Sequence, residues 1–191
     1  MDAHALDRRT IVMFLADIFE RRGSEAYLGE SVTMAEHMLQ GAWLAEQDHA
    51  SDELVAAALL HDVGHFTSEF GAYAPDDTED KHHDDAGAEV LAPFFPPVVV
   101  ACVQLHVAAK RYLCAIDPTY LSKLSEASRH TLSLQGGPMS DQEVAEFRRN
   151  PFHREAVRVR IWDEGGKIVG LKTREFMDYA PLLQRVIEKQ A

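Results

Sequence analysis

Two histidines flank a carboxylate in the segment His61-Asp62-Val63-Gly64-His65, which follows an apolar run beginning at Asp52. If this run is a helix, His61 and His65 share one helical face at i, i+4 spacing. An imidazole nitrogen suits a borderline transition metal, and an adjacent carboxylate has spare lone pairs that can bridge to a second ion. The segment therefore predicts a metal site.

Four residues distant from this segment are candidates to complete the site: His37, His83, His106 and Asp163. A single histidine among methionines, such as His37, is more often a packed core residue than a ligand. His82 and His83 point in different directions from a helix start, so only one of them should reach a metal, and spacing alone does not choose. The order His37…His61-Asp62…Asp163, with histidines between, resembles that of the HD-domain metalloenzymes.

Cationic and hydroxyl side chains accompany these candidates. Lys110 follows His106 by one turn on the same face of a predicted helix, where its ammonium can bind an anion. Ser128 and Thr131 lie on the next predicted helix and carry hydroxyl donors. Arg160 precedes Asp163 by three residues, and this spacing fits either a simple ion pair or a second anion contact.

Composition limits the classes of partner. The net charge of −12 and the pI near 5.2 argue against general binding to nucleic acid or to an anionic membrane, because both need clustered lysine and arginine. Cys102 and Cys114 form no CxxC motif, which fits buried thiols in a reducing cytosol. We find no signal segment and no apolar run approaching the roughly 20 residues of a membrane span, so we expect a cytoplasmic protein.

The hydrophobic pattern is helical throughout, with no strand pattern of useful length, so we predict an all-α fold in which residues 1–191 form a single HD-domain helical bundle. Asp52 is a candidate helix cap, Pro97 a first-turn residue and Ser140 the start of a capping box. The acid-, glycine- and proline-rich stretch 67–82 predicts a long loop over the functional end. The predicted helices cover residues 6–22 (ending at Gly23), 31–46, 52–60, 120–134 and 176–187, with others beginning at His83, Pro97, Ser140 and Pro151.

Several longer motifs carry a more specific resemblance. His106-Val107-Ala108-Ala109-Lys110-Arg111-Tyr112-Leu113, Leu124-Ser125-Glu126-Ala127-Ser128-Arg129, Gln135-Gly136-Gly137-Pro138-Met139 and Trp162-Asp163-Glu164 are similar to those of the HD-domain mixed-valence di-iron phosphonate oxygenases. The similarity extends from about Tyr27 to Lys172 and is weakest in the 67–82 loop.

This resemblance implies a ligand set and a set of substrate contacts. The implied iron ligands are His37, His61, Asp62, His83, His106 and Asp163, with Asp62 bridging two iron ions in the Fe(II)/Fe(III) state. The register of the family motif, with Gly87 and Ala88 after the ligand, selects His83 over His82. The implied phosphonate ligands are His65, Lys110, Ser128, Thr131 and Arg160. The resemblance also implies that Tyr27 and Glu30 belong to a loop that covers one iron in the resting enzyme and moves when substrate binds. With His65 and Lys110 they are the implied catalytic residues.

The implied reaction uses dioxygen to cleave the carbon–phosphorus bond of a 1-hydroxy-2-(amino or trimethylammonio)ethylphosphonate. Its products are phosphate with glycine or glycine betaine. A carboxylate such as Glu30 suits a cationic nitrogen, and an aromatic ring such as Tyr27 suits a trimethylammonium. Two alternatives are a metal-dependent HD phosphohydrolase, which shares His37, His61, Asp62 and Asp163, and a regulatory module without a metal pair. The sequence leaves the oligomeric state open.

Overall fold

The computed structural model describes residues 6–27, 29–67 and 79–190. Within these residues the only β structure is an isolated bridge between Ala26 and Thr33, so the predicted all-α class is confirmed. The helices are α1 (Ile11–Arg22), α2 (Met34–Gln47), α3 (Asp52–Leu60), α4 (Gly64–Thr67), α5 (His83–Leu91), α6 (Pro97–Ile116), α7 (Pro118–Lys123), α8 (Glu126–Leu134), α9 (Asp141–Phe147), α10 (His153–Gly165), the 3-10 helix η2 (Phe176–Tyr179) and α11 (Ala180–Glu188).

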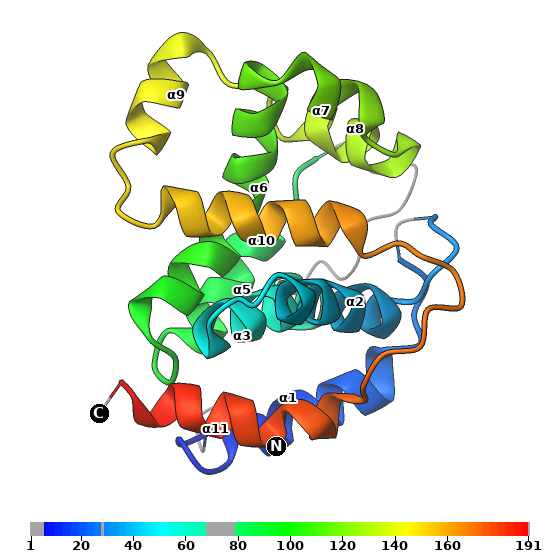
Figure 1. Ribbon diagram of the computed structural model, residues 1–191, viewed down its shortest axis with the longest axis vertical. Helices are drawn as coiled ribbons and strands as arrows, with labels where there is room; N and C mark the ends of the chain where they lie inside the picture. Colours follow the sequence, from blue (N-terminus) through cyan, green and yellow to red (C-terminus); the bar gives the residue numbers. More distant parts are fainter. Residues whose placement is uncertain (1–5, 28, 68–78, 191) are drawn as a thin grey trace.

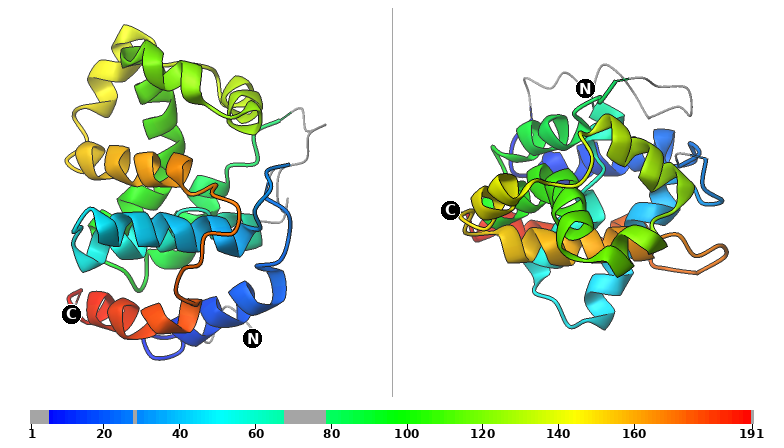
Figure 2. Two further views of the ribbon diagram at one scale, coloured as in Figure 1. Left: turned by 45° about the vertical axis from the view of Figure 1, so that its right-hand side comes forward. Right: turned by 90° about the horizontal axis from the view of Figure 1, so that it is seen from above.

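The helices are stacked in layers (Figure 1). The first and last helices, α1 and α11, lie side by side at one end, and α2, α3 and α5 form the next layer. Helix α10 crosses above them and packs on both α2 and α6, while α7, α8 and α9 lie at the far end (Figures 1 and 2). Helices distant in the sequence therefore meet in the middle of the molecule.

Helix α3 is the centre of the core because it is apolar on every side. All residues from Leu54 to Leu60 are buried, at most 5% exposed. It contacts α2, α6, α10 and α11, and a helix that is hydrophobic all round is stable only when it is covered in this way. The end of α3 is thereby held at the middle of the molecule, where the His61-Asp62 pair follows.

Helix α6 contradicts the expectation that no segment is long and apolar enough to span a membrane. With 20 residues it is long and apolar enough to span a membrane by length and composition, although we expected no such segment. More than half of its apolar window is buried against other helices, and its buried side chains include His106 and Lys110. Cys102 and Cys114 on the same helix are free and buried, as predicted.

Several predicted helix boundaries differ from the structure. The N-cap of α3 is Ser51, and Asp52 instead lies in the first turn, where it accepts hydrogen bonds from Arg185. The expected helix over 120–134 is two helices, because Ser125 interrupts it and its hydroxyl caps α8 by accepting from the backbone N–H of Ser128. The first helix begins at Ile11 rather than at residue 6. Most of the predicted 67–82 loop lies outside the described residues.

Other local signals are confirmed. Pro97 opens α6, and Ser140 opens α9 with a capping box that is closed by Glu143. A second capping box, between Thr33 and Glu36, opens α2. Because α2 carries His37 in its first turn, this cap fixes the helix start beside that residue.

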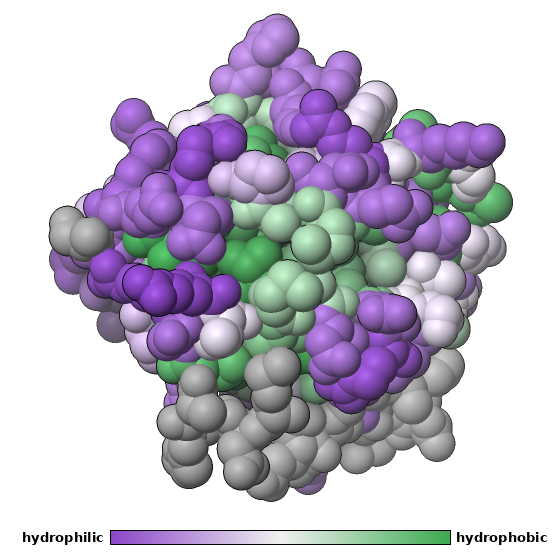
Figure 3. Space-filling model, turned by 90° about the horizontal axis from the view of Figure 1, so that it is seen from below, coloured by the Kyte–Doolittle hydropathy of each residue, from purple (hydrophilic) through white to green (hydrophobic). Residues whose placement is uncertain are grey.

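The face formed by α1 and α11 is mixed in character (Figure 3). An apolar area lies at its centre, surrounded by hydrophilic side chains. Met13 on α1 and Met177 on η2 are about half exposed and line a shallow hollow beside Phe19 and Leu39.

Candidate metal centre

The backbone turns sharply where the His61-Asp62 pair stands. Helix α3 ends at Leu60, residues 61–63 form a turn, and α4 begins at Gly64. The prediction that His61 and His65 share one helical face is therefore wrong, since they do not lie on one continuous helix. The turn instead sends the side chain of Asp62 between two groups of histidines.

The first group brings together His37, His61 and Asp163 from α2, the end of α3 and α10. The Nε2 atoms of the two histidines are 3.0 Å apart, and the Oδ1 atom of Asp163 lies 3.3 Å from His37 and 3.7 Å from His61. The Nδ1 atoms lie 2.9 Å from the carbonyl of Gly166 and 2.8 Å from that of Ala58, where they can donate. That tautomer turns both Nε2 lone pairs towards one point, as metal-binding histidines require.

The second group contains His83 from α5 and His106 from α6. Their Nε2 atoms are 3.0 Å apart and lie 3.4 and 3.3 Å from Oδ1 of Asp62. The Nδ1 atom of His106 is 2.7 Å from the carbonyl of Val103. His65 joins this group from α4, because its Nε2 is 3.9 Å from Asp62 Oδ1 and its ring stacks on that of His83. The neighbouring His82 is exposed.

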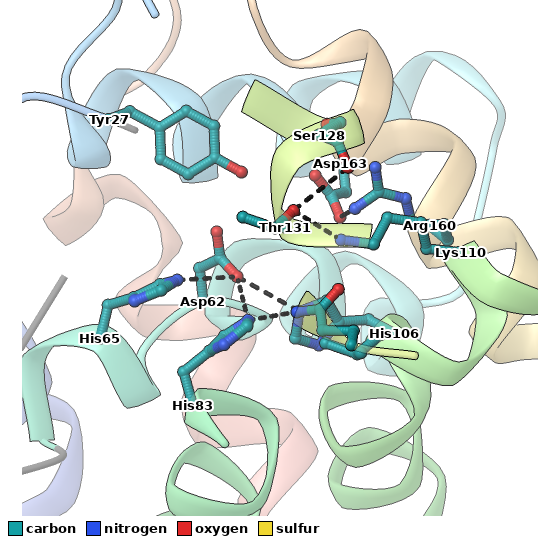
Figure 4. A pocket seen from close by; sticks show the side chains of 12 residues that line it. Tyr27, Asp62, His65, His83, His106, Lys110, Ser128, Thr131, Arg160 and Asp163 are labelled. Carbon is teal, nitrogen blue, oxygen red and sulfur yellow. Dashed lines mark hydrogen bonds and ion pairs between the residues drawn. The ribbon is translucent and has the colours of Figure 1, made fainter. Parts of the chain in front are cut away.

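Asp62 lies between the two groups and divides its oxygens between them. Its Oδ2 is 3.5 Å from the Nε2 atoms of both His37 and His61, whereas its Oδ1 faces the second group (Figure 4). Two clusters of buried nitrogen and carboxylate donors that share one carboxylate fit a pair of borderline metal ions. The six residues predicted as ligands are at most 4% exposed: His37, His61, Asp62, His83, His106 and Asp163.

The charges of the cluster support metal binding. Burial favours the neutral form of Asp62 and Asp163, yet nearby imidazoles, and Arg160 beside Asp163, hold the pKa of each carboxyl well below its usual range. Burial opposes protonation of His37, but hydrogen bonds to Asp163 and Asp62 raise its pKa to about 9. The site thus holds two buried anionic carboxylates that need positive charge nearby.

Tyr27 covers the first group. Its ring stacks on that of His37, with centroids 3.8 Å apart and planes 15° from parallel. The turn behind it is closed by a bond from the N–H of Glu30 to the carbonyl of Tyr27 and includes Gly29 in the left-handed region. The Oε1 atom of Glu30 lies 3.6 Å from the ammonium of Lys167.

A pocket beside Asp62 contains the predicted phosphonate ligands (Figure 4). Lys110 is 4% exposed, and its ammonium donates a 2.8 Å hydrogen bond to the hydroxyl of Thr131. Burial, and then the nearby Arg160, lower the pKa of Lys110 to about 7. Ser128 and Thr131 are both buried in the pocket wall. The structure thus brings a cation and two hydroxyl groups together next to the shared carboxylate.

Arg160 forms the ion pair that its spacing suggested. Its guanidinium contacts the carboxylates of Asp163 and Glu164, and its Nε donates to the hydroxyl of Tyr120 at 2.8 Å. The residue also lines the pocket. Three of its donors already have partners in this structure, so its predicted role as a phosphonate ligand uses the N–H groups that remain.

Two residues of the site, Lys167 and Gln135, were not predicted from the sequence. The ammonium of Lys167 donates to Ser128 at 2.9 Å and to Glu164 at 3.1 Å, and so joins α8 to the end of α10. No spacing rule connects Lys167 with Ser128, which is 39 residues away. Gln135 lines the pocket, and the only available signal was its place at the head of the Gln-Gly-Gly-Pro-Met motif.

Comparison with known proteins agrees with this geometry. The model of the HD domain family matches residues 34–164, which include all six predicted metal ligands. The chain is 56% identical over 188 residues to the [1-hydroxy-2-(trimethylamino)ethyl]phosphonate dioxygenase (glycine-betaine-forming) of Leisingera caerulea, covering 98% of this chain and 96% of the relative. It is 44% identical over 178 residues to the hydroxymethylphosphonate dioxygenase of Gimesia maris, covering 93% and 88% of the two chains.

Proposed function

Because this chain belongs to the HD-domain family of phosphonate dioxygenases, we propose that it cleaves the carbon–phosphorus bond of [1-hydroxy-2-(trimethylamino)ethyl]phosphonate with dioxygen. The products are glycine betaine and inorganic phosphate. The observation that carries this proposal is the position of Asp62, whose two oxygens face two separate groups of buried histidines beside a pocket with anion-binding side chains. A shared carboxylate of this kind suits a pair of metal ions.

We infer that the two ions are iron, in a mixed-valence Fe(II)/Fe(III) pair. Histidine nitrogen and carboxylate oxygen are common donors for non-haem iron. His37, His61 and Asp163 would hold one ion, His83 and His106 the other, and Asp62 would contact both. Such an iron pair, when bound, would supply the chemistry that activates dioxygen. Two irons per chain, together with the low-temperature electron paramagnetic resonance signal of a coupled mixed-valence pair, would support this inference.

The protein's own side chains account for binding of the phosphonate. A phosphonate dianion accepts hydrogen bonds and needs fixed positive charge, which the ammonium of Lys110 provides together with the hydroxyl of Thr131. Binding of the dianion beside Lys110 favours the charged ammonium, whose pKa is lowered in the free site. Because these groups are buried, they would also shield the bound phosphonate from water.

The nitrogen of the substrate is assigned to Glu30 and Tyr27. Glu30 already faces a cation, since the ammonium of Lys167 lies 3.6 Å from its carboxylate. The substrate's trimethylammonium would take a similar place, with Tyr27 providing an aromatic face. A trimethylammonium donates no hydrogen bond, so its affinity would come from charge and from contact with the ring.

To test this proposal, phosphate release by the iron-loaded protein is measured with three phosphonates, each in the presence and absence of dioxygen. The substrates carry a 2-trimethylammonio group, a 2-amino group or, in hydroxymethylphosphonate, no nitrogen. We expect the fastest release of phosphate from the trimethylammonio compound, and one atom of labelled dioxygen in the new carboxylate of glycine betaine. Phosphate released equally well without dioxygen would instead establish the HD phosphohydrolase alternative.

A further inference from the structure

Gln135 is a buried polar residue whose side chain has no partner. The residue is 9% exposed, and neither Nε2 nor Oε1 of its amide makes a hydrogen bond to any part of the chain that the structure describes. A buried amide without partners costs free energy, and native proteins rarely retain one without a reason. Its place in the wall of the pocket, with Lys110 and Thr131, indicates that the missing partner is a ligand.

The backbone around Gln135 is firmly fixed. Gln135 ends α8 and donates its backbone N–H to Thr131, so the two residues lie one turn apart. Gly136 and Gly137 follow in the left-handed region, with φ of 92° and 73°. Arg111 holds this turn from α6, because its Nε donates to the carbonyl of Gly137 at 2.8 Å and its backbone carbonyl accepts from Met139. The Gln-Gly-Gly-Pro-Met motif thereby presents a single amide to the pocket.

Several donors of the pocket are already used within the protein, so an anion with three oxygens needs others. Arg160 donates to Asp163, Glu164 and Tyr120, so much of its fork is occupied. The hydroxyl of Ser128 donates to Glu164. A phosphonate group can only accept hydrogen bonds when it is a dianion, and the Nε2 of Gln135 carries two donors that are not otherwise used.

We propose that Gln135 is a substrate-binding residue whose side-chain amide donates a hydrogen bond to a phosphonate oxygen. This inference rests on the proposed function. The amide would add a neutral donor to the cation and hydroxyls of the pocket. The Gln-Gly-Gly-Pro-Met turn would then serve to position this amide. An amide does not titrate, so its contribution to binding is the same across the working pH range.

The test compares Gln135→Met with the wild-type holoenzyme in two measurements. Methionine keeps the length of the side chain and removes the donor. We expect KM for [1-hydroxy-2-(trimethylamino)ethyl]phosphonate to rise by about ten- to hundredfold, the usual loss for one hydrogen bond to a charged group, with kcat little changed. The melting temperature should stay the same or rise, because the variant removes a buried amide that has no partner.

Gln40 provides a matched control for stability. It is also a buried glutamine, 1% exposed, but both of its amide atoms are bonded to the backbone of Ile168, at 2.9 and 2.8 Å. Gln40→Met should therefore lower the melting temperature. A second variant, Gln135→Glu, replaces the donor with a negative charge and should raise KM more than Gln135→Met does.

The outcomes separate the two proposals. A wild-type enzyme that releases no phosphate from this substrate contradicts the proposed function. An active wild type whose KM is unchanged in Gln135→Met or Gln135→Glu overturns the role of Gln135 alone. A raised KM accompanied by a loss of stability as large as that of Gln40→Met also overturns it, because Gln135 would then serve packing.

Discussion

At the scale of single residues, Asp62 lies between the two groups of predicted metal ligands, with one carboxylate oxygen facing each group. Replacing Asp62 with alanine removes a donor from each ion and leaves the facing imidazoles without a counter-charge. We expect Asp62→Ala to lose both irons and all turnover, as measured by iron content per chain and phosphate release. Retention of two irons by this variant would contradict the shared-carboxylate assignment.

His82 and His83 form a matched pair for testing the second metal group. The ring of His83 is buried and its Nε2 faces Asp62, whereas His82 next to it is exposed. We expect His83→Ala to bind less iron and lose activity, because a histidine ligand is missing. His82→Ala should keep the iron and the activity of the wild type. Equal loss of iron in the two variants would show that His83 has no special role.

The lowered pKa of Lys110 predicts how phosphonate binding and protein stability change with pH. Burial lowers its pKa from 10.5 to about 7, so the ammonium becomes neutral above pH 7 in the free site and binding of the phosphonate should weaken there. The unfolded chain binds more protons than the folded one between about pH 7 and 10.5, so this residue makes stability rise with pH over that interval. We expect Lys110→Met to remove both trends, measured as KM and melting temperature against pH. A variant with the wild-type pH profiles would refute this account.

At the scale of helices, the close contact between α4 and α5 positions half of the site. A methyl group added to Gly64 would lie 1.8 Å from the carbonyl oxygen of His83 and 2.7 Å from the backbone N–H nitrogen of Gly87. Backbone atoms cannot turn aside as a side chain can, so Gly64→Ala must separate the two helices. We expect a loss of several kcal/mol in stability and reduced iron content.

Gly165 serves as the control for this substitution. A methyl group added there meets only the tip of the Leu44 side chain, at 2.9 Å. Gly165→Ala should change the melting temperature little, since Leu44 can move and alanine favours a helix by about 1 kcal/mol over glycine. Comparable damage from both variants would show that the contact between α4 and α5 is not specially sensitive.

The helical elements were predictable where the signals were local. Pro97, Ser140 and the apolar run of α3 act through neighbours in the sequence, and the structure agrees with them. The break at Ser125 was missed because a pattern of apolar spacing continued across it, although a serine cap was present. The turn at residues 61–63 depends on how closely Gly64 approaches α5, and no local rule contains that contact.

The candidate site, like the helices, was predictable from the sequence only in part. The chemical types of its side chains could be read from the sequence. The structure brings all the predicted residues to one region. Their individual roles stay predictions. The mutual arrangement was not visible, because Lys167 and Tyr120 reach the site from distant segments. The contact of Arg160 with Tyr120 likewise arises from tertiary packing, whereas its pairs with Asp163 and Glu164 follow from helical spacing.

At the scale of the whole molecule, the layer of α1 and α11 supports the site-bearing helices. Leu183 on α11 is fully buried, whereas the neighbouring Arg185 makes a half-exposed ion pair with Asp52 at 3.0 Å. We expect Leu183→Ala to cost about 2–5 kcal/mol of stability. Arg185→Ala should cost less than about 1 kcal/mol, because exposed ion pairs contribute little. Chemical denaturation measures both, and a larger effect from Arg185→Ala would show that charge rather than packing holds this layer.

The burial of the pocket cations affects how fast the substrate arrives. Lys110 and Arg160 are each only 4% exposed, while the chain as a whole carries a net charge of −12. We expect the negative net charge to repel an approaching phosphonate before it reaches these groups. Added salt shortens the Debye length to about 8 Å at physiological ionic strength and should weaken this repulsion. We expect kcat/KM to increase as sodium chloride is raised from low concentration, the opposite of an enzyme that steers its anionic substrate electrostatically. A steady decrease would mean that the buried cations act on the substrate from well outside the pocket.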